Sequence, residues 1–260
     1  MKKSGIALLA LLVFISLWTG GALLGFPGFA NLALASFIGV VLVIACFYLR
    51  FEESGSDSRM IALIGAVSAL SIAGRVFAVA LPGAEPSTFI IIAGGYVLGP
   101  LNGFMIGATT ALISNLFLGH GPWTPWQMLA WGLAGLASGL LGKRKHLEGR
   151  LLFSFYSGGW AILFGWIVNL YFILGFVRPI NLQSVVATFG ASLVFDLSHF
   201  TATWLYAFFL GPALIAMLRR YRTRLDFEHL GSSGPVQTCS PFRAPADPGV
   251  RPCKEAGFPP

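Results

Sequence analysis

The sequence predicts an all-α integral membrane protein, because two features exclude an ordinary soluble domain. Hydrophobic residues make up 56% of the 260 residues and charged residues only 10%, whereas soluble proteins have about 25% charged residues. The apolar residues also occur in long runs, and about 20 of them suffice for a helix to cross a bilayer. The length suits one membrane domain of six to eight helices.

Eight apolar segments follow one another along the chain, separated by polar or Gly/Pro-rich breaks. We expect helices at about residues 5–25, 30–49, 59–81, 88–99, 101–119, 123–142, 151–175 and 185–218. The fourth is short because Gly99-Pro100 interrupts what could be one long helix. Proline lacks a backbone donor and disfavours helix in the residue before it.

These segments divide the chain into four parts. Residues 1–52 form two N-terminal transmembrane helices, 53–58 a cytoplasmic linker, 59–224 a six-helix core and 225–260 a Pro/Gly/Ser-rich tail that we expect to be disordered. The first helix, with "ALA" at 33–35, could also be a signal peptide. Its apolar run is too long for one, and cleavage would leave the second helix too short to span a membrane.

Three basic clusters give an orientation. They are Lys2-Lys3, "KRKHLEGR" at 143–150 and "RRYRTR" at 219–224. The positive-inside rule places all three in the cytoplasm, and eight crossings satisfy it at every step. We therefore expect a multi-pass protein of the cell membrane with both termini cytoplasmic. The formal charge of +7 then reflects topology and not nucleic-acid binding.

Polar residues at outer or central depth on five core helices predict a binding pocket. They are Arg75, Asn115, Gln127, Asn169, Asp196 and His199. Polar side chains are costly within a bilayer and usually face a cavity or the protein interior. The inner halves of the same helices are mostly Ala, Gly, Leu and Ile, so the pocket should open to the outside and be closed toward the cytoplasm. A channel would need polar lining along its full length.

Structural alternatives remain open for these residues. Asn115 and Asn169 could simply join helices through hydrogen bonds. Arg75 could extend its charge outward or form a structural bridge with Asp196. Asp196 could also relay protons, although no second carboxylate lies near it in the sequence.

The segment "NLFLGHGPWTPWQMLAWGL" (115–133) contains the most polar groups in the apolar core. Trp123, Gln127 and Trp131 are spaced i, i+4, i+8 and lie on one stripe of a helix. An aromatic–amide–aromatic stripe suits a flat heterocycle, because rings stack and the amide fixes orientation. His120, in the preceding turn, is a further candidate or a solvated loop residue. Trp126 is more typical of a membrane interface.

The third helix carries small residues at a spacing that allows close helix approach. They are Ala62, Ala66, Ala69 and Ala73, with Gly65 on the same face. This face could pack within the chain or could dock a separate membrane subunit.

This small-residue helix, "GGYVLGPLNGFMIGATTALISNLFLG" and "GHGPWTPWQMLAWGLAGLASGLLG" together resemble the substrate-binding S component of energy-coupling factor (ECF) transporters, over about residues 59–222. The resemblance implies a six-helix core that binds a vitamin in an outward-facing pocket. It also implies partnership with a membrane coupling subunit (T component) and two cytoplasmic ATPases, and a coupling face formed by Ala62, Ala66, Ala69 and Ala73. The two N-terminal helices are additional to that core.

The "WTPxQ" pattern at 123–127 is most similar to the branch associated with cobalamin or its precursors, while riboflavin, folate and other heterocyclic vitamins remain open. We expect no catalytic residues, metal or cofactor: the sequence contains no P-loop, HExxH or GxSxG motif. Ser157 in "FYSGG" is the one conceivable hydrolase nucleophile, near the cytoplasmic face. A self-sufficient secondary transporter is the main alternative, but it usually shows inverted repeats, and none is convincing.

Overall fold

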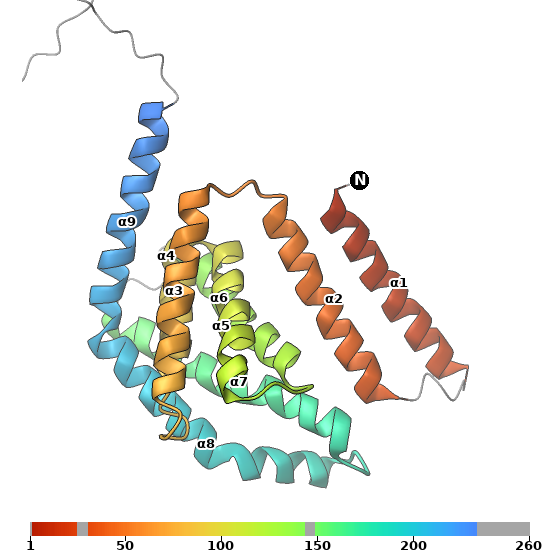
Figure 1. The fold of residues 1–260 in the computed structure, drawn as a ribbon. Helices are drawn as coiled ribbons and strands as arrows, with labels where there is room; N and C mark the ends of the chain where they lie inside the picture. Colours follow the sequence, from red (N-terminus) through yellow and green to blue (C-terminus); the bar gives the residue numbers. More distant parts are fainter. Residues whose placement is uncertain (1, 25–30, 144–148, 233–260) are drawn as a thin grey trace, which may run out of the picture.

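The computed structural model describes residues 2–24, 31–143 and 149–232, and these residues form helices without any strand (Figure 1). Six of the helices are long and apolar enough to cross a membrane, namely α1, α2, α3, α5, α7 and α8. The expectation of an all-α membrane protein is therefore confirmed. The helices are α1 (Lys3–Leu23), α2 (Leu32–Glu52), α3 (Ser58–Phe77), α4 (Ser87–Leu98), α5 (Pro100–Leu118), α6 (Thr124–Lys143), α7 (Arg150–Phe176), α8 (Leu182–Phe209) and α9 (Gly211–Ser232).

The short helix α4 lies at the centre of the core. Every one of its residues is buried, and it contacts α3, α5, α6, α7, α8 and α9. The expected break after it is present: Gly99 has φ 101°, and Pro100 begins α5. Glycine adopts this left-handed conformation without steric cost, and proline fits the first turn of a helix because no intrahelical donor is needed there.

Glycines bring α4, α5 and α6 into backbone contact. A Cβ atom on Gly135 of α6 would lie 2.0 Å from the carbonyl oxygen of Gly103 on α5. A Cβ on Gly107 would lie 2.2 Å from the Trp131 carbonyl oxygen, and one on Gly95 of α4 would lie 2.2 Å from the Gly135 carbonyl oxygen. Small residues allow such close packing between membrane helices. These contacts fix the positions of the side chains that project from the same three helices.

The last apolar segment, expected as one helix over 185–218, is divided into α8 and α9. The break falls at Leu210, two residues before Pro212, because proline cannot donate a helical hydrogen bond to the carbonyl four residues earlier but fits the first turn of a new helix. Helix α9 then continues to Ser232, past the helix end expected at 218 and into the first residues of the tail, 225–260, that we expected to be disordered. The rest of the expected tail, 233–260, lies outside the described residues.

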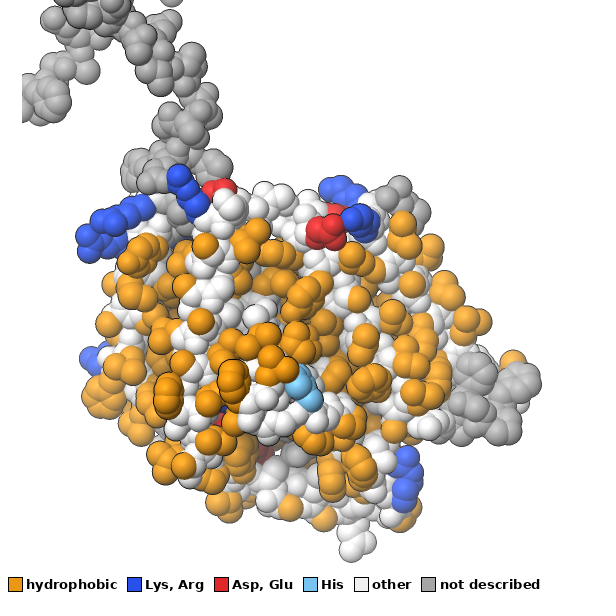
Figure 2. Space-filling model, viewed as in Figure 1, with side chains coloured by type: hydrophobic (Ala, Val, Ile, Leu, Met, Phe, Trp, Pro, Cys, Tyr) orange, Lys and Arg blue, Asp and Glu red, His pale blue; other side chains and the backbone are white. Residues whose placement is uncertain are grey.

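Basic residues gather at one end of the bundle. Figure 2 shows most Lys and Arg side chains near the start of α1 and along α9, with apolar side chains covering most of the face beyond them. We call this the basic end; Lys143 closes α6 there, and residues 219–224 lie on α9. The opposite, far end carries the loops at 78–86, 119–123 and 177–181.

Helices α1 and α2 form a hairpin beside the core (Figure 1). Helix α1 packs on α2, and α2 packs on α5, α6 and α7. The ring of Phe47 on α2 stacks on Phe104 of α5 with centroids 3.9 Å apart. At the basic end, Lys3 pairs with Glu52 at 2.7 Å. The hairpin is therefore attached to the core through α5, α6 and α7, whereas α3 packs mainly on α4 and α5.

We predict that Gly135→Ala destabilises the protein by about 1–3 kcal/mol, the usual cost of overpacking a filled core. The added methyl group would meet backbone atoms of Gly103, which cannot rotate away. Thermal unfolding in detergent measures the effect. Gly159→Ala on α7 is the matched control, because a Cβ there meets nothing within 4 Å. Equal melting temperatures for the two variants would contradict the proposed backbone contact.

Candidate functional site

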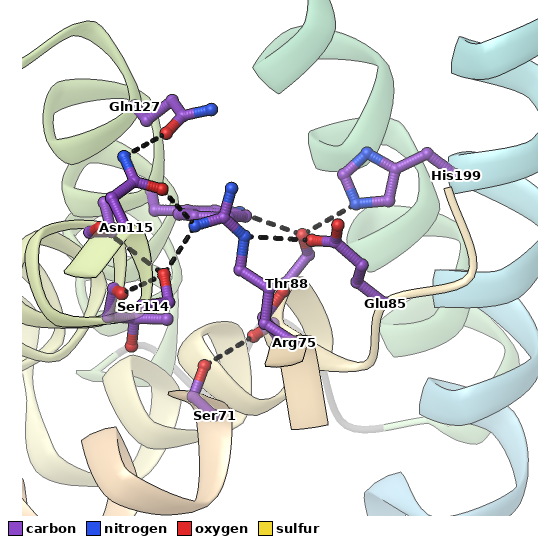
Figure 3. A network of polar contacts seen from close by, with 12 residues as sticks. Ser71, Arg75, Glu85, Thr88, Ser114, Asn115, Gln127 and His199 are labelled. Atoms are coloured by element: carbon purple, nitrogen blue, oxygen red, sulfur yellow. Dashed lines mark hydrogen bonds and ion pairs between the residues drawn. The ribbon is translucent and has the colours of Figure 1, made fainter. Parts of the chain in front are cut away.

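A buried polar network lies at the far end, between the ends of α3 and α5 and the starts of α4 and α6 (Figure 3). Its centre is Arg75, in the last turn of α3 and only 7% exposed. The guanidinium Nη1 donates hydrogen bonds to Asn115 Oδ1 at 2.7 Å and to the Ser114 hydroxyl. Its Nε donates to Glu85 Oε2 at 3.2 Å. The charge is thus paired within the protein.

Asn115 connects Arg75 to the start of α6. Its amide nitrogen donates to Gln127 Oε1 at 2.8 Å and to Thr124 Oγ1 at 3.0 Å. Thr124 Oγ1 also lies 3.3 Å from His120 Nδ1, in the turn before α6. One asparagine therefore accepts from the arginine and donates to two residues of the next helix, which orders the α5–α6 connection.

Trp131 supplies an aromatic surface beside the guanidinium. The Arg75 Cζ atom lies 4.7 Å from the Trp131 ring centroid, a cation–π distance. The indole Nε1 donates to Thr88 Oγ1 at 3.0 Å, and the ring stacks on Phe164 with centroids 4.4 Å apart. Thr88 Oγ1 is also hydrogen-bonded to His199 Nε2 at 2.9 Å. The ring is fully buried and fixed on two sides.

Glu85 is the functional candidate that the sequence reasoning missed. It lies in the 78–86 loop, ten residues after Arg75, and forms the ion pair that Asp196 was considered for. Burial raises the pKa of the Glu85 carboxyl above its ordinary value, and the Arg75 guanidinium opposes that shift. The available signal was a charged residue in the otherwise apolar, Pro/Gly-rich segment "LPGAEPS". A turn of this kind brings the chain back toward the end of α3.

The loop that carries Glu85 is held against α8. Ser198 Oγ donates to the Pro82 carbonyl oxygen at 2.9 Å, and the Tyr206 hydroxyl donates to the Ala84 carbonyl oxygen at 3.1 Å. Gly83, with φ 76°, packs so closely on Ser198 that a Cβ would lie 2.9 Å from its hydroxyl. These contacts place the carboxylate over the guanidinium.

Two predicted residues form a second, separate set between α7 and α8. Asn169 Nδ2 donates to Ser192 Oγ at 2.8 Å, and Ser192 Oγ donates to Asp196 Oδ2 at 2.9 Å. The other oxygen, Asp196 Oδ1, has no hydrogen-bond partner among the described residues and packs against Gly165. This set joins two helices and shares no hydrogen bond with the Arg75 network in the described part of the chain.

Other expectations differ from the structure in detail. Trp123 is 38% exposed and its ring packs over Gly121, outside the network, whereas Trp126 is buried and not at the surface. The Ser157 hydroxyl donates to the Phe153 carbonyl oxygen one turn earlier in α7, at 2.8 Å. The hydroxyl of this candidate nucleophile is therefore already hydrogen-bonded to the backbone of its own helix.

The network residues lie at the end of the bundle where an outward-open pocket was expected, and in this structure they contact one another. Arg75, Asn115, Trp131 and His199 are all buried and connected directly or through Thr88. Four cavities among the described residues lie at the basic end. The described residues contain no group of three metal-ligating side chains. The far end therefore holds donors, acceptors and an aromatic face, which suit recognition of a polar ring.

A sequence model of the family described as "ECF-type riboflavin transporter, S component" matches residues 56–215, more than half of the chain. No curated protein and no solved structure matches the chain significantly. The matched residues run from just before α3 into α9 and include the whole Arg75 network. The two N-terminal helices lie outside the match.

We predict that Arg75→Gln lowers stability by about 3–5 kcal/mol, the usual cost of breaking a buried ion pair, because Glu85 keeps a buried charge without its partner. In the Arg75→Gln/Glu85→Gln double variant the losses should be non-additive by about 0.5–3 kcal/mol. Chemical unfolding in detergent measures the stability of Arg75→Gln, of Glu85→Gln and of the double variant. The control pairs Arg75→Gln with Asp196→Asn, and there the losses should add. Strong coupling between Arg75 and Asp196 would contradict the pairing of Arg75 with Glu85.

Proposed function

The chain belongs to the family of ECF-type riboflavin transporter S components, and we propose that it captures a flat heterocyclic vitamin at the network around Arg75 and Trp131. Members of this family are substrate-binding subunits of vitamin transporters and not enzymes. The observation that carries the proposal is the placement of a guanidinium, two amides and a fixed indole within one buried cluster. Ligand pockets combine an apolar or aromatic lining with a few placed polar groups.

A ligand would bind by replacing contacts that the protein now makes with itself. The Glu85 carboxylate already accepts from Arg75, as the carbonyl oxygens of a flavin-type ring would. Asn115 and Gln127 exchange one amide hydrogen bond, and each amide has a donor and an acceptor to offer. Trp131 gives such a ring a surface for stacking. Entry requires the 78–86 loop to move, because this loop holds Glu85 over the site.

Riboflavin is the first ligand to test, because the matching family is described by it. Its ring system is flat, and it alternates donors and acceptors along one edge. Cobalamin or a precursor, to which "WTPxQ" at 123–127 is similar, is the second candidate. A corrin ring is much larger and would require a wider displacement of the far-end loops. The closed packing of the network therefore favours the smaller ring.

The exposed face of α3 supports the proposed partner. Ala62, Ala66 and Ala69 are exposed, and a Cβ on Gly65 would meet no atom within 4 Å; Ala73 is half-buried. Small residues on an open helix face suit close approach by another membrane helix. We propose that a T component docks on this face and connects the chain to two ATPases. With the basic end in the cytoplasm of a cell-membrane protein, the Arg75 network faces the outside.

We predict that riboflavin quenches the tryptophan fluorescence of the purified chain without ATP. Gln127→Ala should weaken binding about tenfold, the loss expected for one hydrogen bond of about 1.4 kcal/mol. Trp166→Phe is the control: that ring is half-exposed on α7, and its variant should bind as the original chain does.

Three results would redirect this proposal. Tighter binding of cobalamin than of riboflavin selects the second ligand. Absence of binding by any tested vitamin contradicts vitamin capture. Vitamin uptake into vesicles that contain the chain alone, driven by an ion gradient, would identify a self-sufficient secondary transporter.

We predict that Ala66→Leu and Ala69→Leu each prevent co-purification with the coupling subunit, because a branched side chain keeps the two helices apart. Vitamin binding by the isolated variants should be unchanged, since both positions are exposed. Ala191→Leu on α8, also exposed, is the matched control and should co-purify normally. Unchanged association in the α3 variants would show that the subunit docks elsewhere.

A further inference from the structure

A cavity of about 540 Å³ lies at the basic end, whereas the Arg75 network lies at the far end. It is bounded by the end of α4, the start of α7, the end of α8 and the first turns of α9. Most of its lining is apolar, including Phe153, Ile215 and Ala216. Two arginines, Arg150 and Arg219, also line it. Charged and apolar walls in one cavity indicate an amphipathic ligand.

The two guanidiniums approach the cavity from different helices. Arg150, at the start of α7, lies over the Phe208 ring at 4.1 Å and donates from Nε to the Phe208 carbonyl oxygen. Arg219, two turns into α9, lies 5.7 Å from the centroid of the Tyr96 ring. Neither forms an ion pair with an acidic side chain among the described residues. The cavity therefore has two positive charges that an anion can neutralise.

Tyr96 is the independent observation that points to a ligand. Its side chain is only 5% exposed and lines the cavity, packed against Phe153 with centroids 5.9 Å apart. Its hydroxyl has no hydrogen-bond partner in the described part of the chain. An unsatisfied buried hydroxyl costs about 1–3 kcal/mol. An oxygen atom carried into the cavity on an anion would accept this hydrogen bond.

We propose that this cavity binds the phosphate group of an anionic phospholipid, held by Arg150, Arg219 and the Tyr96 hydroxyl. The apolar lining then contacts the start of an acyl chain. A soluble phosphate has no apolar group that could make this contact. Exposed Leu151, Leu152 and Phe155 continue the apolar surface along α7 beside the cavity. Basic pockets between membrane helices are suited to anionic headgroups, which are concentrated at the cytoplasmic surface.

The test uses the full-length chain purified in a neutral detergent, with bound lipid measured by native mass spectrometry. Phosphatidylglycerol should bind more tightly than phosphatidylcholine. Arg150→Gln and Arg219→Gln should each weaken phosphatidylglycerol binding about fivefold, the change that about 1 kcal/mol per arginine near an anionic lipid produces. Tyr96→Phe, which removes only the hydroxyl, should also weaken it. Arg220→Gln is the matched control, since Arg220 lies on α9 and lines a different cavity.

Other outcomes would overturn the proposal. Equal binding of the two lipids, or equal losses in Arg219→Gln and Arg220→Gln, would mean that the cavity does not recognise an anionic headgroup. Displacement of the lipid by an equal concentration of glycerol 3-phosphate would assign the site to a soluble phosphate. Tyr96→Phe preserves the shape of the core and keeps the test decisive where an arginine variant fails to fold.

Discussion

A guanidinium held inside an apolar helix bundle must be paired, and the far end of this protein is arranged around that requirement. An isolated buried charge costs several kcal/mol. Arg75 meets the requirement with partners from three places: the Glu85 carboxylate on a loop, the Asn115 amide at the end of α5 and the Trp131 ring on α6. The α3–α4 loop must return over α3, and α5 must end beside α6, for these groups to converge.

The glycine contacts between α4, α5 and α6 make this convergence possible. Thr88, Asn115 and Trp131 project from the three helices whose backbones touch through Gly95, Gly103 and Gly135. A bulkier residue at any of these contacts would separate the helices and lengthen the hydrogen bonds between them. Thr88, Asn115 and Trp131 therefore stand on closely packed helices, whereas Glu85 stands on a loop. In the proposed binding cycle the loop is the part that would exchange its contacts for those of a ligand.

Apolar runs and proline positions were enough to predict most helices, and the depth of polar residues was enough to propose Arg75, Asn115, Gln127 and His199. Depth gives the height of a side chain along the bundle, but it does not give the direction in which the side chain points around the axis of its helix. Asn169 and Asp196 lie at suitable heights, yet they face each other across α7 and α8. Glu85 and Thr88 were missed because their roles depend on the path of a loop and on one cross-bundle contact. The break before Pro212 was not predicted, although proline seldom continues a helix and was a signal for it.

Helix α3 connects the ligand site and the docking face that we propose for this protein. Arg75 lies in its last turn, and Ala66 and Ala69 are exposed about two turns earlier on the same helix. In the proposed binding mode a ligand takes the place of Glu85 beside Arg75, and the far end of α3 then loses its link to the 78–86 loop. Any resulting tilt of α3 acts on the small-residue face directly, without a chain of intermediate side chains. Coupling of this kind is reciprocal, so docking on that face would in turn change the affinity of the network for its ligand.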